Sequence, residues 1–222
     1  MTSILPTAVV PSTRAAVCAA VAIAWLAVAP IASACETAPD LSIEVTSRFD
    51  TTPVRNDYTL ADIAALARQQ HRDLGRALLG FYTSAFGYTV DLLPEGDAVC
   101  PTRIATTVTL RLQNRLIEIG RDVAANSCVY PGALRHYRRL AAVDEQTVQR
   151  FGARAAAMLA QASPTLKQTH ASHAEDLDAA LRDQIRALVD RAVAPLHDAR
   201  QDAQQAVNSA GELKQLASDC SI

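Results

Sequence analysis

The sequence has little net charge, few aromatic residues and no glycine-rich phosphate loop. Its 222 residues carry a formal net charge of −2, and 5% of them are aromatic. A near-neutral chain lacks the positive surface that attracts nucleic acid, and scarce aromatic side chains offer bases little to stack on. No G-x-S-x-G motif supports a serine nucleophile. Half of the residues are apolar, and this composition predicts a globular domain with a core and no nucleic-acid partner.

The first 34 residues differ from the rest because they contain no acid and a single basic residue, Arg14. An apolar run from Ala15 to Ala29 precedes Ala32-Ser33-Ala34. This order predicts a secretory signal peptide over residues 1–34, cleaved after Ala34, and one exported domain over residues 35–222 that is periplasmic or secreted. Two alternatives stay open: the apolar run is retained as an anchor, or Cys35 is lipidated as in a lipoprotein. No second apolar run of spanning length follows, so we expect no transmembrane segment after signal removal.

Cleavage at this point removes Cys18 and leaves four cysteines, Cys35, Cys100, Cys128 and Cys220. An even number in an oxidising compartment predicts disulfide bonds, here with three alternative pairings. We expect Cys100 to bond with Cys128, which closes a local hairpin, and Cys35 to bond with Cys220, which ties the chain ends together. A metal site of four cysteines is the rival interpretation, but the short C-x-x-C spacing is missing.

Alternating polar and apolar residues predict strands in the first half of the mature chain. A helix capped by Asp57 or Thr59 should follow the first strand and end near Gly80. The turn Pro94-Glu95-Gly96-Asp97 should end the second of four expected strands. Gln113-Asn114-Arg115 predicts a tight hairpin between the third strand and the fourth. The expected strands are Leu41–Arg48, Gly87–Leu93, Ile104–Leu112 and Leu116–Ile119.

Helical periodicity dominates after Cys128. One apolar stripe runs from Pro131 to about Gln161, where Ser163-Pro164 should interrupt it. A second helical stretch covers Thr165 to Ala217, and Pro195 should kink or split it. We therefore predict an α+β fold: a small antiparallel sheet packed with long antiparallel α-helices and stabilised by disulfides. The C-terminal helix should pack on its own domain, with a homodimer or a protein partner as the alternative.

Three segments carry a resemblance to a known family: CPTRIATTVTLRL, LIEIGRDVAANSCVY and LRHYRRLAAVDEQTVQRF. Their order of hairpin, cysteine, tyrosine and histidine-bearing helix, over roughly residues 87–160, resembles secreted bacterial zinc-dependent proteases whose helix carries HExxH. In that motif two histidines one helical turn apart bind zinc, and the glutamate between them acts as general base. The resemblance thus implies a zinc site on the helix that begins near Pro131.

The corresponding stretch here is His136-Tyr137-Arg138-Arg139-Leu140, which keeps only the first ligand. Tyr137 replaces the base, and a phenol that ionises near pH 10 is a poor base at neutral pH. Leu140 replaces the second histidine and cannot bind a metal. Arg138 and Arg139 add positive charge beside the position that a cation would occupy.

We therefore expect no catalytic residue and no cofactor. His136 is interpreted as a packed or hydrogen-bonded side chain, and Asp144 and Glu145 as solvated carboxylates that lie beyond the i,i+4 reach of Arg135 and Arg138. The predicted function is that of an exported cell-envelope protein, related to zinc proteases but inactive, that acts as a binding or structural component. The alternative is an active zinc-dependent hydrolase with a non-standard site around His136. Weak metal candidates for that alternative are His136, Asp144, Glu145, His170 and His173.

Overall fold

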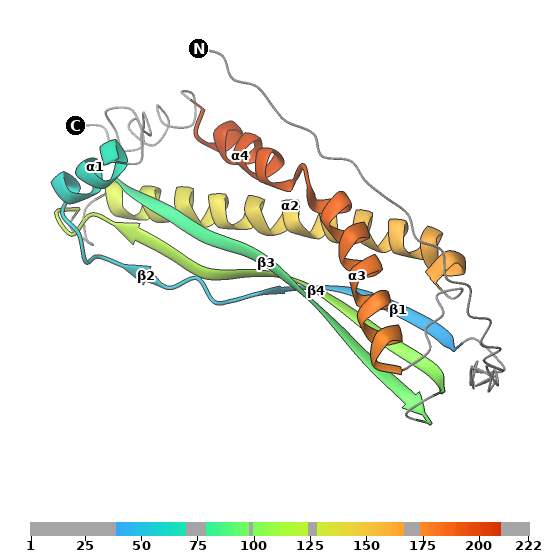
Figure 1. Cartoon of the computed structure of the whole chain (residues 1–222). Coiled ribbons are helices and arrows are strands. Elements are labelled where there is room, and N and C mark those ends of the chain that lie inside the picture. Colours follow the sequence, from blue (N-terminus) through green and yellow to red (C-terminus); the bar gives the residue numbers. More distant parts are fainter. Residues whose placement is uncertain (1–38, 70–78, 98–99, 124–127, 167–173, 210–222) are drawn as a thin grey trace, which may run out of the picture. The chain divides into compact units, whose positions relative to one another are not determined.

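The longest strand, β4, is the centre of a four-stranded mixed sheet (Figure 1). The computed structural model describes residues 39–69, 79–97, 100–123, 128–166 and 174–209, all within one compact unit of residues 33–222. The fold is mixed α+β, and its sheet packs against three helices, α2, α3 and α4. The strands are β1 (Asp40–Phe49), β2 (Val54–Arg55), β3 (Gly80–Gly96) and β4 (Pro101–Ile119).

The sheet is partly parallel. β1 pairs in parallel with the first half of β4, from Asp40 beside Arg103 to Phe49 beside Leu112, and β2 pairs with β4 further along the same edge. On the other edge β3 pairs with β4 in antiparallel orientation. The predicted antiparallel pairing is therefore confirmed for β3 with β4 and wrong for β1, and the short strand β2 was not predicted. Paired residues of these strands and β4 are 63 residues apart in the sequence, and a long crossover of this kind permits parallel pairing.

The hairpin predicted at Gln113-Asn114-Arg115 is wrong, because β4 runs through these residues without a turn. Asn114 has a φ of 54°, a left-handed conformation that asparagine tolerates, and the pairing with β3 shifts register between Thr83 and Ala85. The result is a bulge that reverses which side of β4 is buried. Even-numbered residues from Ile104 to Leu112 face the core, and Arg115 and Ile117 face it beyond the bulge.

The true hairpin joins β3 to β4. β3 continues through Pro94, the expected turn, and ends at Gly96, whose φ is 99°. Pro94 is tolerated because β3 is an edge strand, so its missing N–H need not remove a sheet hydrogen bond. A Cβ at residue 96 would lie 2.9 Å from the Thr102 hydroxyl, so both the conformation and the space favour glycine there.

The helices are α1 (Leu60–Gln69), α2 (Val129–Leu166), α3 (Ala174–Val193) and α4 (Leu196–Val207). Thr59 caps α1 through a reciprocal pair of bonds: its backbone N–H donates to the Asp62 carboxylate at 2.9 Å, and its hydroxyl accepts from the Asp62 N–H at 3.1 Å. The predicted continuation of this helix to Gly80 falls largely outside the described residues. Pro195 splits the C-terminal helical stretch into α3 and α4, as expected.

The interruption expected at Ser163-Pro164 is wrong, because α2 continues to Leu166. Pro164 lies in the last turn of the helix and is exposed. It has no N–H to donate to the carbonyl of Ala160, which is exposed as well. That carbonyl can hydrogen-bond with water, so the proline costs less here than it would in a buried helix interior.

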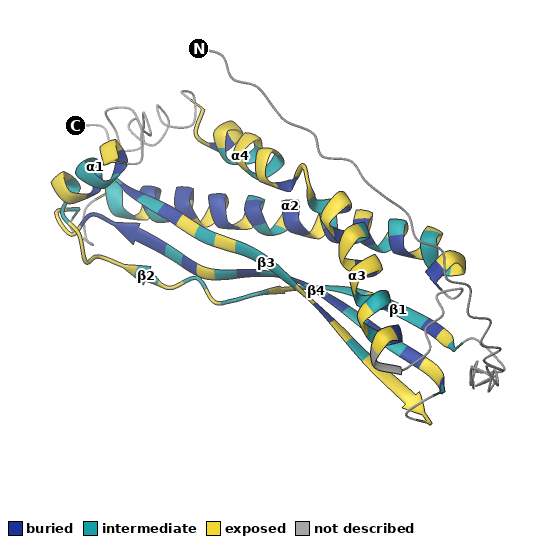
Figure 2. Ribbon diagram, viewed as in Figure 1, coloured by how far each residue is buried: buried dark blue, intermediate teal, exposed yellow. Residues whose placement is uncertain are grey.

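α2, α3 and α4 lie on one face of the sheet, and their buried sides turn toward it (Figures 1 and 2). The main core forms between this face, α2 and α3, and includes Val108, Leu110, Val148, Ile185 and Val189, each with 0% exposed surface. A second apolar cluster joins the end of β4 to the first turns of α2 and to Val207 of α4. The apolar stripe of α3 is thus buried within its own domain, as the sequence favoured.

Up to the bulge at Asn114, the opposite face of the sheet is polar. Thr46 of β1, Thr109 of β4 and Thr89 of β3 are register neighbours on this face, and the Thr46 hydroxyl donates to the Thr109 hydroxyl at 3.3 Å. A sheet that buries one face and hydrates the other produces the alternation of polar and apolar residues seen in β1.

Candidate functional site

Three of the metal candidates lie on α2, along the side that faces the sheet and α4. His136 and Asp144 are buried, with 6% and 0% exposed surface, and Glu145 is half-buried. His136 and Asp144 are eight residues apart, which is about 12 Å along a helix. His170 and His173 lie outside the described residues. The structure therefore keeps His136 too far along the helix from Asp144 for both to bind one small cation.

His136 hydrogen-bonds with α4's C-terminal end. Its Nε2 lies 2.9 Å from Oδ1 of Asn208, the residue that follows α4. The ring also packs edge-on against Tyr137, with centroids 5.1 Å apart. These contacts agree with the packed and hydrogen-bonded histidine that the sequence favoured over a metal ligand.

Tyr137 connects α2 with β3 through a hydrogen bond. Its hydroxyl donates to the backbone carbonyl of Gly80 at 2.7 Å, and only 6% of the residue is exposed. Burial raises the pKa of the Tyr137 phenol well above its usual range, and the hydrogen bond to Gly80 opposes this only in part. A phenol held in its protonated form in this way cannot act as a general base near neutral pH.

Asp144 lies at the centre of a buried polar cluster. Arg200 of α4 donates to both of its oxygens, from Nε to Oδ1 at 2.5 Å and from Nη2 to Oδ2 at 3.0 Å. Tyr82 and Ser84 of β3 also donate to Oδ2, at 3.0 and 2.6 Å. The prediction of a solvated Asp144 is wrong, because the residue is fully buried and is bound by Arg200, 56 residues further along the chain.

A second ion pair adjoins the first through Tyr82. Arg115 Nη2 donates to Glu145 Oε1, Nη1 donates to the Asp50 carbonyl at 2.8 Å, and Nε lies 3.5 Å from the Tyr82 hydroxyl. Glu145 was expected to be solvated; it is half-buried, and its ion-pair partner comes from β4. The bulge at Asn114 turns Arg115 inward, where it is 7% exposed and its guanidinium lies 5.9 Å from the Phe49 ring centroid.

We call this set the Asp144 cluster; its members are Tyr82, Ser84, Arg115, Asp144, Glu145 and Arg200. It contains two carboxylates and two guanidinium groups, so its formal charge is balanced. Desolvation raises the pKa of Tyr82 above its usual range, so this phenol stays protonated as a donor to Asp144. Both oxygens of Asp144 already accept hydrogen bonds, and a guanidinium cation lies against them. Zinc does not fit this carboxylate without displacing Arg200.

Within the described part of the chain, no three histidine, cysteine or acidic side chains gather in a way that could hold a metal ion. The Asp144 cluster instead provides structural support. It connects β3, β4, α2 and α4 through charge-assisted hydrogen bonds.

Glu118, which was not among the predicted site residues, is fully buried near the end of β4. Its Oε1 accepts hydrogen bonds from the backbone N–H groups of Asp57 at 2.5 Å and Tyr58 at 3.1 Å. These bonds fix the segment that leads into α1. The signal was present as a lone acid between Ile117 and Ile119, two apolar residues on the opposite side of the strand.

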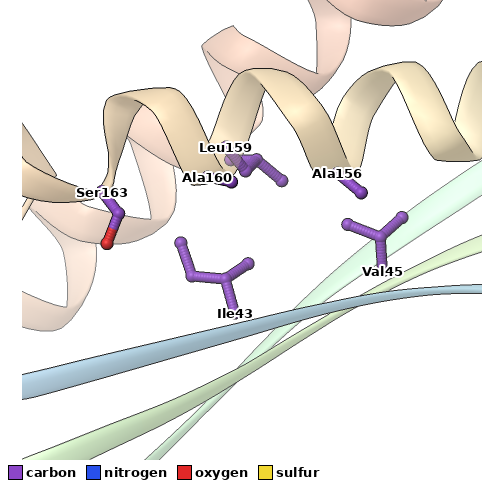
Figure 3. A pocket seen from close by; sticks show the side chains of 6 residues that line it. All are labelled: Ile43, Val45, Ala156, Leu159, Ala160 and Ser163. Atoms are coloured by element: carbon purple, nitrogen blue, oxygen red, sulfur yellow. The ribbon is translucent and has the colours of Figure 1, made fainter.

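An apolar hollow of about 270 Å³ opens between the edge strand β1 and the second half of α2. Ile43 and Val45 point from β1 toward α2, as Figure 3 shows. The hollow is lined by Ile43, Val45, Ala156, Leu159, Ala160 and Ser163. Ser163 supplies the only side-chain polar atom in this lining, which therefore offers no acid or base for catalysis.

Cys100 and Cys128 lie at opposite ends of β4. Cys100 immediately precedes β4, and Cys128 immediately precedes α2. The first turns of α2 lie at the far end of β4, because Tyr137 binds Gly80 and Gly80 pairs with Ile119. A strand of 19 residues spans about 60 Å, whereas a disulfide requires Cα atoms closer than about 7 Å.

The predicted bond between Cys100 and Cys128 is therefore wrong. Each of the two cysteines is nevertheless disulfide-bonded. The other predicted bond, between Cys35 and Cys220, lies outside the described residues.

No protein-family model matches this chain, and no curated protein or solved structure is detectably similar to it. The resemblance to secreted zinc proteases accordingly stays a prediction. Of the helices within the described residues, none combines the length and the apolar character that a membrane span requires.

Proposed function

We propose that the chain is an exported, disulfide-stabilised component of the cell envelope that binds or supports other envelope components and does not hydrolyse peptides. The observation that carries this proposal is the environment of Asp144. This carboxylate has no exposed surface, and it is bound by Arg200, Tyr82 and Ser84. The helix that resembles a protease motif thus uses its acidic residue to hold α4 and β3.

The other residues of the motif support the same proposal. His136 contacts Asn208 and Tyr137 contacts the Gly80 carbonyl, so both side chains join α2 to other elements. A zinc hydrolase built from His136, Asp144 or Glu145 and one of His170 and His173 is the competing proposal. Such an enzyme would have to break the Asp144–Arg200 pair before Asp144 could bind metal, and a buried arginine left unpaired is costly.

Metal analysis of the purified mature chain, residues 35–222, separates the two proposals. The protein is equilibrated with zinc, desalted and measured by plasma mass spectrometry, beside His136→Ala and a control, His197→Ala, on the exposed side of α4. We expect substoichiometric zinc that neither substitution changes, and no hydrolysis of a casein substrate. One zinc per chain that His136→Ala removes and His197→Ala preserves would overturn the proposal.

Export is tested on the N-terminus of the protein recovered from bacterial cells. We expect a periplasmic or secreted chain that begins at Cys35. A chain that still carries residues 1–34 would identify a retained anchor, and an acylated Cys35 would identify a lipoprotein.

A further inference from the structure

We propose that the mature chain forms two disulfides in sequence order, Cys35 with Cys100 and Cys128 with Cys220. One ties the beginning of the chain to the start of β4, and the other ties the end of the chain to the start of α2. The oxidant comes with the proposed export, and the pairing itself follows from the register of the sheet and the reach of the chain.

The register of β1 limits where Cys35 can lie. Asp40, the first residue of β1, pairs with Arg103, three residues after Cys100. Cys35 precedes Asp40 by five residues, and five residues span at most about 18 Å when fully extended. Cys35 is therefore tethered near the end of the sheet at which Cys100 lies.

The same tether keeps Cys35 away from Cys128. From Arg103 to Ile119, β4 rises by about 50 Å. α2 runs back along the sheet from the Ile119 end. Near its start, Tyr137 hydrogen-bonds with Gly80, the partner of Ile119, whereas Gly152, later in the helix, lies beside Ser47 and Leu110. Cys128 precedes Tyr137 on this path, so it lies beyond the reach of Cys35.

Cys128 then has one cysteine left in the mature chain, Cys220. Asn208 hydrogen-bonds with His136. His136 follows Cys128 by eight residues, which is about 12 Å along a helix. Cys220 follows Asn208 by twelve residues, which span up to about 43 Å. The tether is long enough for this bond, and the alternative of Cys100 with Cys220 would leave Cys35 and Cys128 with no reachable partner.

Each bond forms by thiol–disulfide exchange with an oxidised dithiol, of the kind that a thiol oxidoreductase carries or that glutathione disulfide supplies. Two protein thiols give up two protons and two electrons and become one disulfide. The disulfide of the oxidant takes them up and becomes two thiols.

The two resulting loops follow each other along the chain and do not overlap. The first, residues 35–100, encloses β1, β2, α1 and β3, and the second, residues 128–220, encloses α2, α3 and α4. β4 belongs to neither loop. The bonds predicted from the sequence alone would instead have nested one loop within the other.

Peptide mapping without reduction tests the pairing. The mature chain, residues 35–222, is purified, refolded in a glutathione redox buffer and cut with trypsin, so the test does not depend on export. Each cysteine falls in a separate fragment: residues 35–48, 77–103, 122–135 and 215–222. We expect cross-linked pairs of the first with the second and of the third with the fourth. Any other cross-link, or free thiols in the folded protein, would overturn the proposal.

Single substitutions give an independent readout of the partners. Cys35→Ser should expose one thiol to a maleimide, and the labelled residue should be Cys100. Cys220→Ser should in the same way expose Cys128. Labelling of Cys128 in the Cys35→Ser protein, or of Cys220, would contradict the proposed pairs. In the protein recovered from cells, an acylated Cys35 would overturn the first bond while leaving the second to stand.

Discussion

Arg200 binds Asp144 through two parallel hydrogen bonds, from Nε to Oδ1 at 2.5 Å and from Nη2 to Oδ2 at 3.0 Å. The arginine comes from α4 and the aspartate from the middle of α2, and 14% and 0% of the two side chains are exposed. α4 buries few apolar residues of its own, chiefly Leu196 and Val207. Together with these apolar contacts and the hydrogen bond between His136 and Asn208, the ion pair holds this short helix on α2.

Asp144→Ala should lower the free energy of unfolding by about 3–5 kcal/mol, because it leaves the partly buried Arg200 without its counter-ion. Urea denaturation measures this loss. The control is Asp183→Ala, which breaks the exposed Asp183–Arg186 pair at 4.0 Å and should change stability by about 0.5 kcal/mol or less. In a double-mutant cycle with Arg200→Ala, additive effects would show that the two residues do not stabilise the fold as a pair.

Tyr137→Phe should lower the free energy of unfolding by about 1 kcal/mol. The substitution keeps the ring, so packing is preserved, and it removes the 2.7 Å hydrogen bond to the Gly80 carbonyl. Tyr58→Phe is the matched control, because Tyr58 is 41% exposed. Equal stability of the Tyr137→Phe and wild-type proteins in thermal or urea unfolding would refute the role of this bond in holding α2 to β3.

Alkaline pH should destabilise the fold partly through Tyr88. Desolvation, followed by the hydrogen bond and the negative charge of Asp190, raises the pKa of Tyr88 to about 12. The unfolded phenol ionises near pH 10, so the folded state keeps a proton that the unfolded state loses. The stabilisation is present in full below pH 10 and disappears as the pH rises through 12.

Tyr88→Phe should therefore make stability fall less steeply between about pH 10 and 12. Asp190→Ala, which removes the carboxylate that accepts the Tyr88 hydrogen bond at 2.6 Å, should shift tyrosinate absorbance toward lower pH. Unchanged pH profiles in both variants would show that Tyr88 does not titrate as described.

Glu118→Ala should increase hydrogen exchange at the backbone amides of Asp57 and Tyr58, which lose their acceptor. The loss of about 1–3 kcal/mol corresponds to roughly a 5- to 150-fold faster exchange. The neighbouring Leu60 amide is an internal control, because it donates to Asp122 at 2.9 Å. If all three amides accelerate together, the substitution has loosened the whole segment and Glu118 has no specific role.

Local sequence signals predicted the elements whose causes are local. β1 alternates polar and apolar residues from Asp40 to Thr46, and Pro195 divides the C-terminal helical stretch. Thr59 and Asp62 lie three residues apart and form the cap of α1 between themselves. In each case the determining residues lie close together in the sequence, so the sequence alone is enough to predict the element.

The failures at Gln113-Asn114-Arg115 and in the pairing of β1 have a different physical origin, which is a partner distant in sequence. Gln113-Asn114-Arg115 has the composition of a turn, yet Arg115 is held in the strand by Glu145 and by the Asp50 carbonyl. The parallel pairing of Asp40 with Arg103 depends on a crossover that no local pattern encodes.

The candidate site followed the same rule. His136 is packed and hydrogen-bonded, as expected, and the residues on which that expectation was based, Tyr137 and Leu140, lie within its own helix. Asp144 was misjudged because the residue that binds it, Arg200, belongs to another helix. A buried carboxylate among apolar helix positions was the available hint, but it did not identify its partner.

The position of β4 also imposes an order of events on folding. β3 and β4 are joined by a short connection, so their pairing can begin beside it and extend along both strands. Asp40 pairs with Arg103, which is 63 residues further along the chain. Pairing across so long a loop carries a larger entropic cost before any contact forms. We therefore expect β1 to join late, so that its apolar side, with Ile43 and Val45, stays uncovered longest in the newly made chain.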